Sequence, residues 1–384
     1  MNKIRYILPI LFLLLAGCSA DEPVTPVSPS GAEQPLQFRS VVGSAESGQI
    51  YESEYFEEGD QLRVYCPRVY ATPSFETGAP GMYIYEYQKT KDSPDWANWP
   101  YEFQPAGSSG FDWRTLQPTT NVYMFEVLHF PGKDYMEEVP DRQDLPYPDP
   151  SDKSGNSISG LEAADMLLAH RSLPVEEKEK VVRLTFYHMF AMVEVTVELP
   201  VSKTPAEGLF PIDAVKEVYM RQMLTHYKVD YSIRIDDDKL RPVMAPVGGE
   251  RKDVYMKRDA KDEEKDFFDG KDWKNEDVTY QRFVFRGIVP EQSFLDMGND
   301  FLYFNVMRND GSDNPALYKF KFGTGTKPFS LKASQILSIK LRIDNNANEV
   351  VVVAAEVKPW IEVDGAFDMF PEKNKGQEYE NQTI

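Results

Sequence analysis

This chain of 384 residues has few of the residues on which catalysis and metal binding usually depend, with only two cysteines and four histidines. The histidines are His129, His170, His188 and His226. None of them has metal-ligand spacing with another histidine or with a cysteine. A glycine-rich phosphate loop and a nucleophile motif are also absent from the sequence. We therefore expect no enzymatic activity, no bound metal and no cofactor.

Basic residues are scarce as well. Lys and Arg number 42 against 62 Asp and Glu, and the formal net charge is -20. Such an acidic surface repels phosphate backbones, so we expect no nucleic-acid partner. Hydrophobic residues make up 41% and aromatic residues 13% of the chain, a composition typical of a folded protein rich in β-structure. The length allows two domains with a core each.

Long apolar runs are rare, and the one at residues 7–15 lies near the N-terminus behind Lys3 and Arg5. It is too short to span a membrane within a folded protein, and it has the form of a secretory leader. It ends in Leu15-Ala16-Gly17-Cys18, which resembles the lipobox of bacterial lipoproteins. That resemblance implies cleavage before Cys18 and acylation of Cys18, for example with palmitate. Several acyl chains hold a protein stably at a membrane. The alternative is an ordinary secretory signal in which Cys18 is incidental.

Residues 1–17 are thus predicted to be a signal peptide, and residues 18–35 a flexible tether rich in Ser, Pro, Glu and Thr. Asp21 and Glu22 resemble the surface-export signal of lipoproteins in the Bacteroides group. We therefore expect an outer-membrane protein that faces the cell exterior. If Cys18 is acylated, Cys66 has no disulfide partner and is expected to be a buried apolar residue.

The remainder of the chain predicts an all-β fold of two β-sandwich domains. Short strand-like segments, some alternating apolar with polar residues and others almost continuously apolar, are separated by Gly, Pro and Asn turns. The clearest of these segments are 62–66, 82–87, 122–130, 280–288, 301–307, 317–322, 337–343 and 350–357. We assign 36–178 to an N-terminal domain, 179–372 to a C-terminal domain and 373–384 to a polar tail.

Residues 181–199 contain two alternating patterns of opposite phase. Leu184 and Phe186 share one face, whereas Val193 and Val195 share a face one residue out of step. Because a one-residue slip moves every side chain to the other side of a sheet, the strand must bulge or break between Phe190 and Val193. We expect this bent strand, or pair of strands, to open the second domain.

Three other segments are less regular. The polar, proline-rich residues 132–160 predict a loop of unusual length. Residues 161–169 suit either a helical turn or a strand, and their composition favours a helix. The charged residues 248–277 predict a solvated loop, as runs of mixed charge usually do.

Several motifs, in this order along the chain, resemble the fimbrillin family of the Bacteroidetes, which are lipoprotein precursors of the type V pilus. They are the lipobox, residues 56–65 (FEEGDQLRVY), the strand ending at Phe130-Pro131, residues 164–169 (ADMLLA), residues 184–191 (LTFYHMFA), residues 338–343 (SIKLRI) and residues 357–360 (VKPW). Each motif is loose by itself, and the order makes the resemblance specific. It covers residues 18 to about 360.

The resemblance implies two sandwiches of transthyretin-like type and a pilus whose subunits join by strand exchange. In polymerising members an arginine-specific protease removes the first strand. This chain has no Arg or Lys between Val41 and Gln61, which leaves Arg39, inside the opening strand, as the nearby candidate cleavage site. This departure favours an anchor or tip subunit over a repeating stalk subunit. Expected partners are other pilus subunits, the outer membrane, and host or bacterial surface glycans or proteins.

The C-terminal region holds an alternating pattern that could be a donor strand. Its apolar residues are Ile361, Val363, Phe367 and Met369. The other interpretation is a final strand or packed tail of the same domain.

An alternative function, that of a surface glycan-binding lipoprotein, depends on the aromatic segment that contains Trp96, Trp99 and Trp113. Exposed aromatic rings can stack on sugar rings. In the other interpretation these rings fill the core of the first sandwich. The sequence leaves both possibilities open.

Overall fold

The structure is a computed structural model. It describes residues 35–42, 56, 58–66, 80–88, 101–114, 116, 118, 121–130, 138–148, 157–176, 181–204, 209–230, 243–246, 250–262, 266–272, 274–294, 300–309, 314–321, 329–344 and 349–359. Within these ranges the chain is almost entirely β-structure, and its one helix, α1 (Gly160–Ala163), has four residues. The predicted all-β fold is confirmed. No helix in the described part of the chain is long and apolar enough to cross a membrane.

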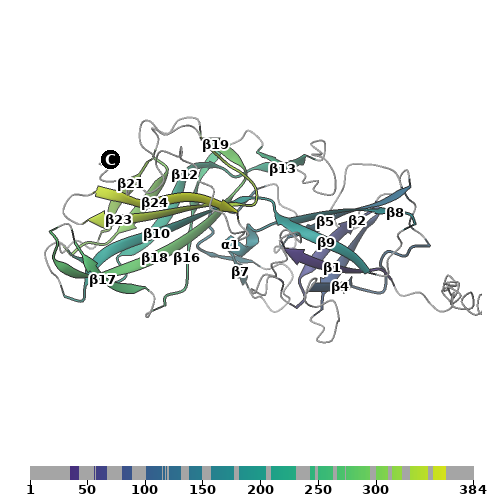
Figure 1. Ribbon diagram of the computed structural model, residues 1–384, viewed down its shortest axis with the longest axis horizontal. Coiled ribbons are helices and arrows are strands. Elements are labelled where there is room, and N and C mark those ends of the chain that lie inside the picture. The colour runs from purple at the N-terminus through teal and green to yellow at the C-terminus, as the bar shows by residue number, and fades with distance from the viewer. Residues whose placement is uncertain are drawn as a thin grey trace, which may run out of the picture. The chain divides into compact units, whose positions relative to one another are not determined.

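The first half of the chain forms a closed barrel in the strand order β1-β4-β3-β2-β5-β8-β9 (Figure 1). Its strands are β1 (Gln37–Val42), β2 (Gln61–Tyr65), β3 (Met82–Tyr87), β4 (Tyr101–Pro105), β5 (Val122–His129), β8 (Leu167–Pro174) and β9 (Val181–His188). The barrel is filled by apolar side chains that include Phe38, Leu62, Tyr85, Phe103, Phe125 and Phe186. A short pair, β6 (Pro146–Pro148) and β7 (Ser157–Ser159), precedes α1.

The second half contains two larger sheets. One has the order β16-β18-β10-β23-β24, with β11 added to β10 and β17 added to β18, and the other has the order β15-β12-β20-β21. The bounds are β10 (Ala191–Ser202), β11 (Phe210–Pro211), β12 (Val215–Leu224), β15 (Arg251–Tyr255), β16 (Lys257–Arg258), β17 (Phe267–Lys271), β18 (Asp277–Val289), β20 (Leu302–Val306), β21 (Ala316–Phe320), β23 (Gln335–Asp344) and β24 (Glu349–Pro359). Two short pairs complete this half: β13 (Tyr227–Asp230) with β14 (Val243–Pro246), and β19 (Gln292–Phe294) with β22 (Phe329–Leu331).

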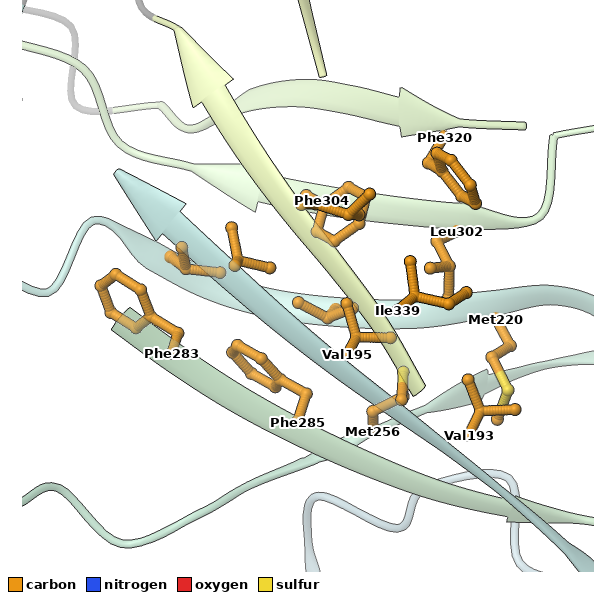
Figure 2. Packing of buried hydrophobic residues seen from close by; sticks show 14 of the residues in the cluster. Val193, Val195, Met220, Met256, Phe283, Phe285, Leu302, Phe304, Phe320 and Ile339 are labelled. Atoms are coloured by element: carbon orange, nitrogen blue, oxygen red, sulfur yellow. The ribbon is translucent and has the colours of Figure 1, made fainter. Parts of the chain in front are cut away.

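These two sheets bury a common core, as a β-sandwich does. Val193 and Ile339 of the first sheet belong to the same buried cluster as Met220 and Phe304 of the second (Figure 2). Alternation explains the arrangement, because every second residue of β10 points into this core while the residues between them lie on the opposite face.

The predicted break in residues 181–199 is confirmed two residues earlier than expected, at Met189 and Phe190. On either side of the break, the chain joins different sheets. β9 pairs with β1 and β8 of the barrel, whereas β10 pairs with β18 and β23. β9 therefore belongs to the barrel and does not open the second set of sheets. The division of the chain into domains 36–178 and 179–372 stays a prediction.

Residues 161–169 contain both of the expected structures. Ser159 caps α1 and forms a capping box with Glu162, and β8 begins at Leu167 after a turn. The long segment 132–160 is also partly structured. Val139 donates a backbone hydrogen bond to the Thr225 carbonyl (2.9 Å), and Gln143 to that of Tyr255 (3.1 Å).

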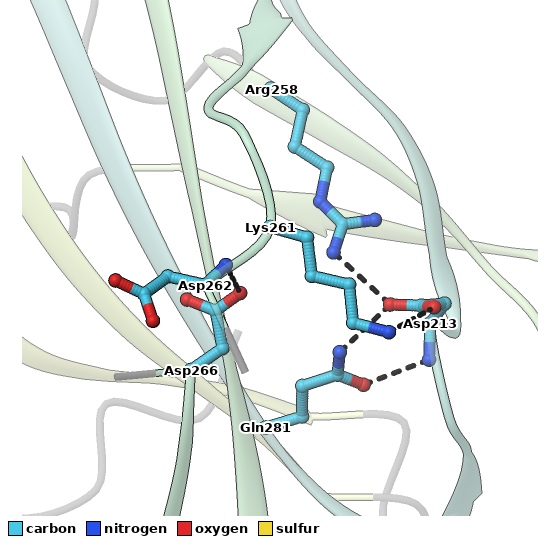
Figure 3. A network of polar contacts seen from close by, with 6 residues as sticks. All are labelled: Asp213, Arg258, Lys261, Asp262, Asp266 and Gln281. Carbon is cyan, nitrogen blue, oxygen red and sulfur yellow. Dashed lines mark hydrogen bonds and ion pairs between the residues drawn. The ribbon is translucent and has the colours of Figure 1, made fainter. Parts of the chain in front are cut away.

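The prediction that residues 248–277 form a solvated loop is wrong. This segment contains β15, β16 and β17, which pair with β12 and β18. Two features explain the difference: Val254 and Met256 face the core, and the charges find partners. Figure 3 shows one such group, in which Asp213 accepts from Arg258 (3.1 Å), Lys261 (3.3 Å) and Gln281 (2.8 Å). These contacts lower the pKa of Asp213, although its partial burial opposes the shift.

Candidate functional site around the first strand

The first strand, β1, lies between two strands that are distant from it in sequence. It pairs antiparallel with β4 over Phe38 to Ser40 and parallel with β9 over its whole length. The backbone of Leu36 also donates to the carbonyl of Phe111 at 2.8 Å. β1 is therefore hydrogen-bonded on both sides within the barrel, although it comes first in the chain.

Alternate side chains of β1 point into the barrel. Leu36, Phe38, Ser40 and Val42 are all buried. The Phe38 ring meets the rings of Tyr85 and Phe125 edge to face, at centroid distances of 4.7 Å and 5.5 Å. Such aromatic contacts add to the apolar burial that holds a strand in place.

Arg39 lies on the other face of β1, opposite Glu102 of β4 in the strand register. Its Nη2 atom donates to Glu102 Oε2 at 2.7 Å, and the two side chains are 12% and 11% exposed. The candidate cleavage site is thus a largely buried, ion-paired residue in a doubly paired strand. A protease needs an extended, accessible segment, so it can reach Arg39 only after β1 leaves the barrel.

Removal of β1 would change the barrel in a defined way. The facing edges of β4 and β9 would lose their hydrogen-bond partners, and the space filled by Phe38 would open. Unpaired edges beside an apolar groove are what an added strand from another subunit requires. In this structure the chain's own first strand occupies that position.

Most of the other site residues predicted from the sequence lie outside the described residues. These are Cys18, the donor-strand candidates Ile361, Val363, Phe367 and Met369, and the stacking candidates Trp96 and Trp99. Trp113 is described and is partly buried against the barrel core. Its ring centroid lies 4.8 Å from that of Tyr123 and 6.1 Å from that of Phe125. A stacking role for Trp113 stays a prediction.

The histidines have protein partners that suit structural roles. His188 Nδ1 lies 2.7 Å from Asp165 Oδ1, and His170 Nδ1 lies 2.7 Å from Glu126 Oε1. Across the described ranges, no group of three His, Cys, Asp or Glu side chains could hold a metal ion. Cys66 is buried one residue beyond β2, and burial raises the pKa of its thiol to about 12.

No protein-family model and no curated protein matches the sequence. Solved structures do match along most of the chain. One is a candidate cell adhesion protein from Bacteroides uniformis, with 14% identity and a TM-score of 0.47, and the match covers 86% of this chain and 100% of that one.

Two further matches are fimbrial proteins of Porphyromonas gingivalis. The tip fimbrial protein Mfa3, with a C-terminal truncation, is 9% identical with a TM-score of 0.31. The fimbrial anchor protein Mfa2 is 11% identical with a TM-score of 0.32. Each match covers 85% of this chain and 98% of the other.

Sequence reasoning found Arg39 but missed its partner Glu102, because nothing local predicts that β1 pairs with β4. It also missed Glu198, a buried carboxylate on β10 that contacts cations of β18 and β23. The sequence did contain a signal for the contact between Glu198 and its cations. Glu198 and Arg342 both occupy polar positions of cleanly alternating strands, and they face each other once the two strands are paired.

Proposed function

We propose that this chain is a fimbrial or adhesive subunit at the cell surface, held in the outer membrane by acylated Cys18 and retained with its first strand in place. One observation carries the proposal: β1 fills its own barrel, with Arg39 buried against Glu102. A subunit that keeps its own strand offers no acceptor groove at that position. The lack of Arg or Lys between Val41 and Gln61, where processing would be expected, favours an anchor or tip position over a repeating stalk position.

The partners proposed are other pilus subunits, joined by strand exchange. A strand from residues 361–369 is the candidate donor for such a joint, because its apolar residues alternate as a half-buried strand requires. A fimbrial or adhesive role is also the one named for the proteins of similar structure. The role is structural, so it needs no catalytic residue and no cofactor.

The test is a blot of native cell envelope, with samples loaded unboiled and boiled. Strand-exchanged polymers resist detergent, because each joint buries the hydrogen bonds of a whole strand. We expect this chain to form one uncut species whose N-terminal residue is the acylated Cys18, either alone or at the end of a polymer of other subunits. A ladder of this chain by itself, with a new N-terminus at Ser40, would overturn the proposal.

A disulfide lock, which is a disulfide between β1 and β4 that can be formed or reduced, tests directly whether β1 must leave the barrel. Ser40 and Tyr101 are directly opposite each other in the antiparallel register, so the double variant Ser40→Cys, Tyr101→Cys keeps Arg39 and can be oxidised or reduced in the same sample. If β1 stays in place during assembly, the oxidised and reduced forms should join pili equally well. Assembly by the reduced form alone would show that β1 must leave.

A further inference from the structure

The face of the β18-β10-β23 sheet that points away from the core has a group of charged residues around one carboxylate. Glu198 of β10 lies opposite Arg282 of β18 and opposite Arg342 of β23 in the strand registers. Its neighbours Val197 and Leu199 point to the other side, into the core. Glu198 therefore lies on the outer face, yet its side chain is fully buried beneath the surrounding cations.

Three cations contact this carboxylate. Lys340 Nζ and Arg282 Nη2 lie 2.8 Å and 3.3 Å from Glu198 Oε1, and Arg342 Nη2 lies 2.9 Å from Glu198 Oε2. The side chains of the three cations are each between 36% and 38% exposed. One buried negative charge thus faces three half-exposed positive charges, in a chain whose formal net charge is -20.

The neighbouring charges on the same face are arranged differently. Arg286 of β18 contacts two carboxylates, Glu194 Oε2 at 2.9 Å and Asp259 Oδ2 at 2.7 Å. Its charge is therefore more than balanced. Around Glu198, by contrast, three described cations contact one carboxylate, and we call these four residues the Glu198 cluster.

The arginines of the Glu198 cluster are held in place by aromatic rings. The Arg282 guanidinium carbon lies 4.9 Å from the Phe268 ring centroid, and that of Arg342 lies 4.6 Å from the Tyr280 centroid. The two rings themselves stack at 5.3 Å. The rings thus hold the two guanidinium groups in position, as a preorganised anion site requires.

We propose that Arg282, Lys340 and Arg342 bind the sulfate or carboxylate groups of an acidic polysaccharide, which competes with Glu198 for these three cations. This inference rests on the proposed adhesive function and names a ligand class for it. A polysaccharide suits the site better than an acidic peptide does. Peptides commonly bind a sheet by adding a strand to a free edge, and β10 is paired on both sides here.

The test measures retention of the full mature chain in gels that contain dextran sulfate, neutral dextran of the same length, or polyglutamate. We expect dextran sulfate to retain the protein and neutral dextran not to retain it. The variant Lys340→Gln should weaken retention about five-fold, the upper range for one exposed ion pair. Arg286→Gln is the matched control, because it removes the same charge from the same face but lies outside the Glu198 cluster, so retention should not change.

A second variant separates a binding role from a purely structural one. Glu198→Gln removes the carboxylate that competes with the ligand for the three cations, so a folded variant should bind dextran sulfate more tightly than the natural chain. Circular dichroism shows whether the variant is folded. If it is not folded, the comparison of Lys340→Gln with Arg286→Gln still tests whether the Glu198 cluster binds the polysaccharide. A role in stability alone predicts no gain in binding.

Three outcomes would overturn the inference. One is equal weakening by Lys340→Gln and Arg286→Gln, which would mean that only bulk charge matters. The second is retention by polyglutamate alone, which would make the occupant an acidic protein. The third is no retention by dextran sulfate. None of these would affect the proposed function, because the envelope blot and the disulfide lock test that function without any polysaccharide.

Discussion

Arg39 and Glu102 form an ion pair across β1 and β4, with Nη2 and Oε2 2.7 Å apart and both side chains nearly buried. The pair joins the only basic residue near the expected processing position to a strand more than sixty residues further along the chain. Burial makes such a pair costly to break, because each charge would remain without its partner. Arg39 therefore contributes to the stability of β1 as well as being a potential cleavage site.

The first prediction concerns the protection of Arg39. In the folded protein, an arginine-specific protease should produce no fragment that begins at Ser40, because β1 is paired on both sides. Arg114 provides an internal positive control, since its side chain is 63% exposed. The measurement is N-terminal sequencing after limited digestion, with and without urea. Cleavage after Arg39 as fast as after Arg114 in native buffer would contradict the prediction.

The second prediction concerns Phe38, which anchors β1 among the rings of Tyr85 and Phe125. Replacing it by alanine leaves a cavity in the barrel, so Phe38→Ala should lower the free energy of unfolding by about 3–5 kcal/mol. Urea denaturation followed by tryptophan fluorescence measures this value. Leu317→Ala is the control, because Leu317 is 47% exposed and its loss should cost about 0.5 kcal/mol or less. Similar losses for both variants would mean that β1 contributes little to stability.

The strands could be predicted from the sequence wherever one face is buried and the other is solvated. The segment 337–343 alternates cleanly and is found within β23, and the change of phase after Phe186 correctly required a break. Alternation is a local property, so a window of a few residues contains it. This is why the existence of most strands, and their approximate bounds, followed from the pattern alone.

Pairing between distant strands could not be predicted in the same way. Nothing in residues 37–42 indicates a parallel partner at 181–186, because hydrogen-bond registers leave no trace in a single sequence. The same limit applied to β15, β16 and β17. The charges of this segment predicted a solvated loop, but their partners, such as Asp213 for Arg258 and Arg286 for Asp259, come from other parts of the chain. The Glu198 cluster, too, became visible only once β10 was placed between β18 and β23.

The third prediction concerns the pH dependence of stability through His129. This side chain is buried, and its Nδ1 atom lies 3.1 Å from the Gln61 carbonyl, which can only accept, so Nδ1 carries the proton. Burial lowers the pKa of His129 below its usual 6.5, although the nearby Asp60 charge opposes this shift. The unfolded chain therefore binds a proton more readily, and His129 must cost stability as the pH falls below 6.5.

The measurement for His129 is the free energy of unfolding in urea at pH 7.5 and at pH 5.5. The natural chain should lose more stability over this interval than His129→Gln, by at most about 1.4 kcal/mol per pH unit for a single group. Comparing the two slopes removes the contribution of the other titrating groups, which both proteins share. Parallel slopes would mean that His129 has the same pKa in the folded and unfolded chains.

The fourth prediction concerns Gln143, whose fully buried side-chain amide pairs with the backbone of β18 as a neighbouring strand would. Its Nε2 donates to the Ile288 carbonyl and its Oε1 accepts from the Ile288 amide, both at 2.7 Å. Gln143→Ala would leave both backbone groups without a partner. Since each buried polar group without a partner costs about 1–3 kcal/mol, the two together should lower the free energy of unfolding by about 2–6 kcal/mol.

The variant Gln143→Glu tests the reason for this loss. At neutral pH its carboxylate can accept from the Ile288 amide but cannot donate to the carbonyl, and a buried charge adds a further cost. A protonated glutamic acid can both donate and accept, so acid should restore the natural pattern. The Glu variant should therefore gain stability relative to the Ala variant as the pH falls from 7 to 5. A difference between the two that does not change with pH would mean that Gln143 acts by filling space rather than by pairing with Ile288.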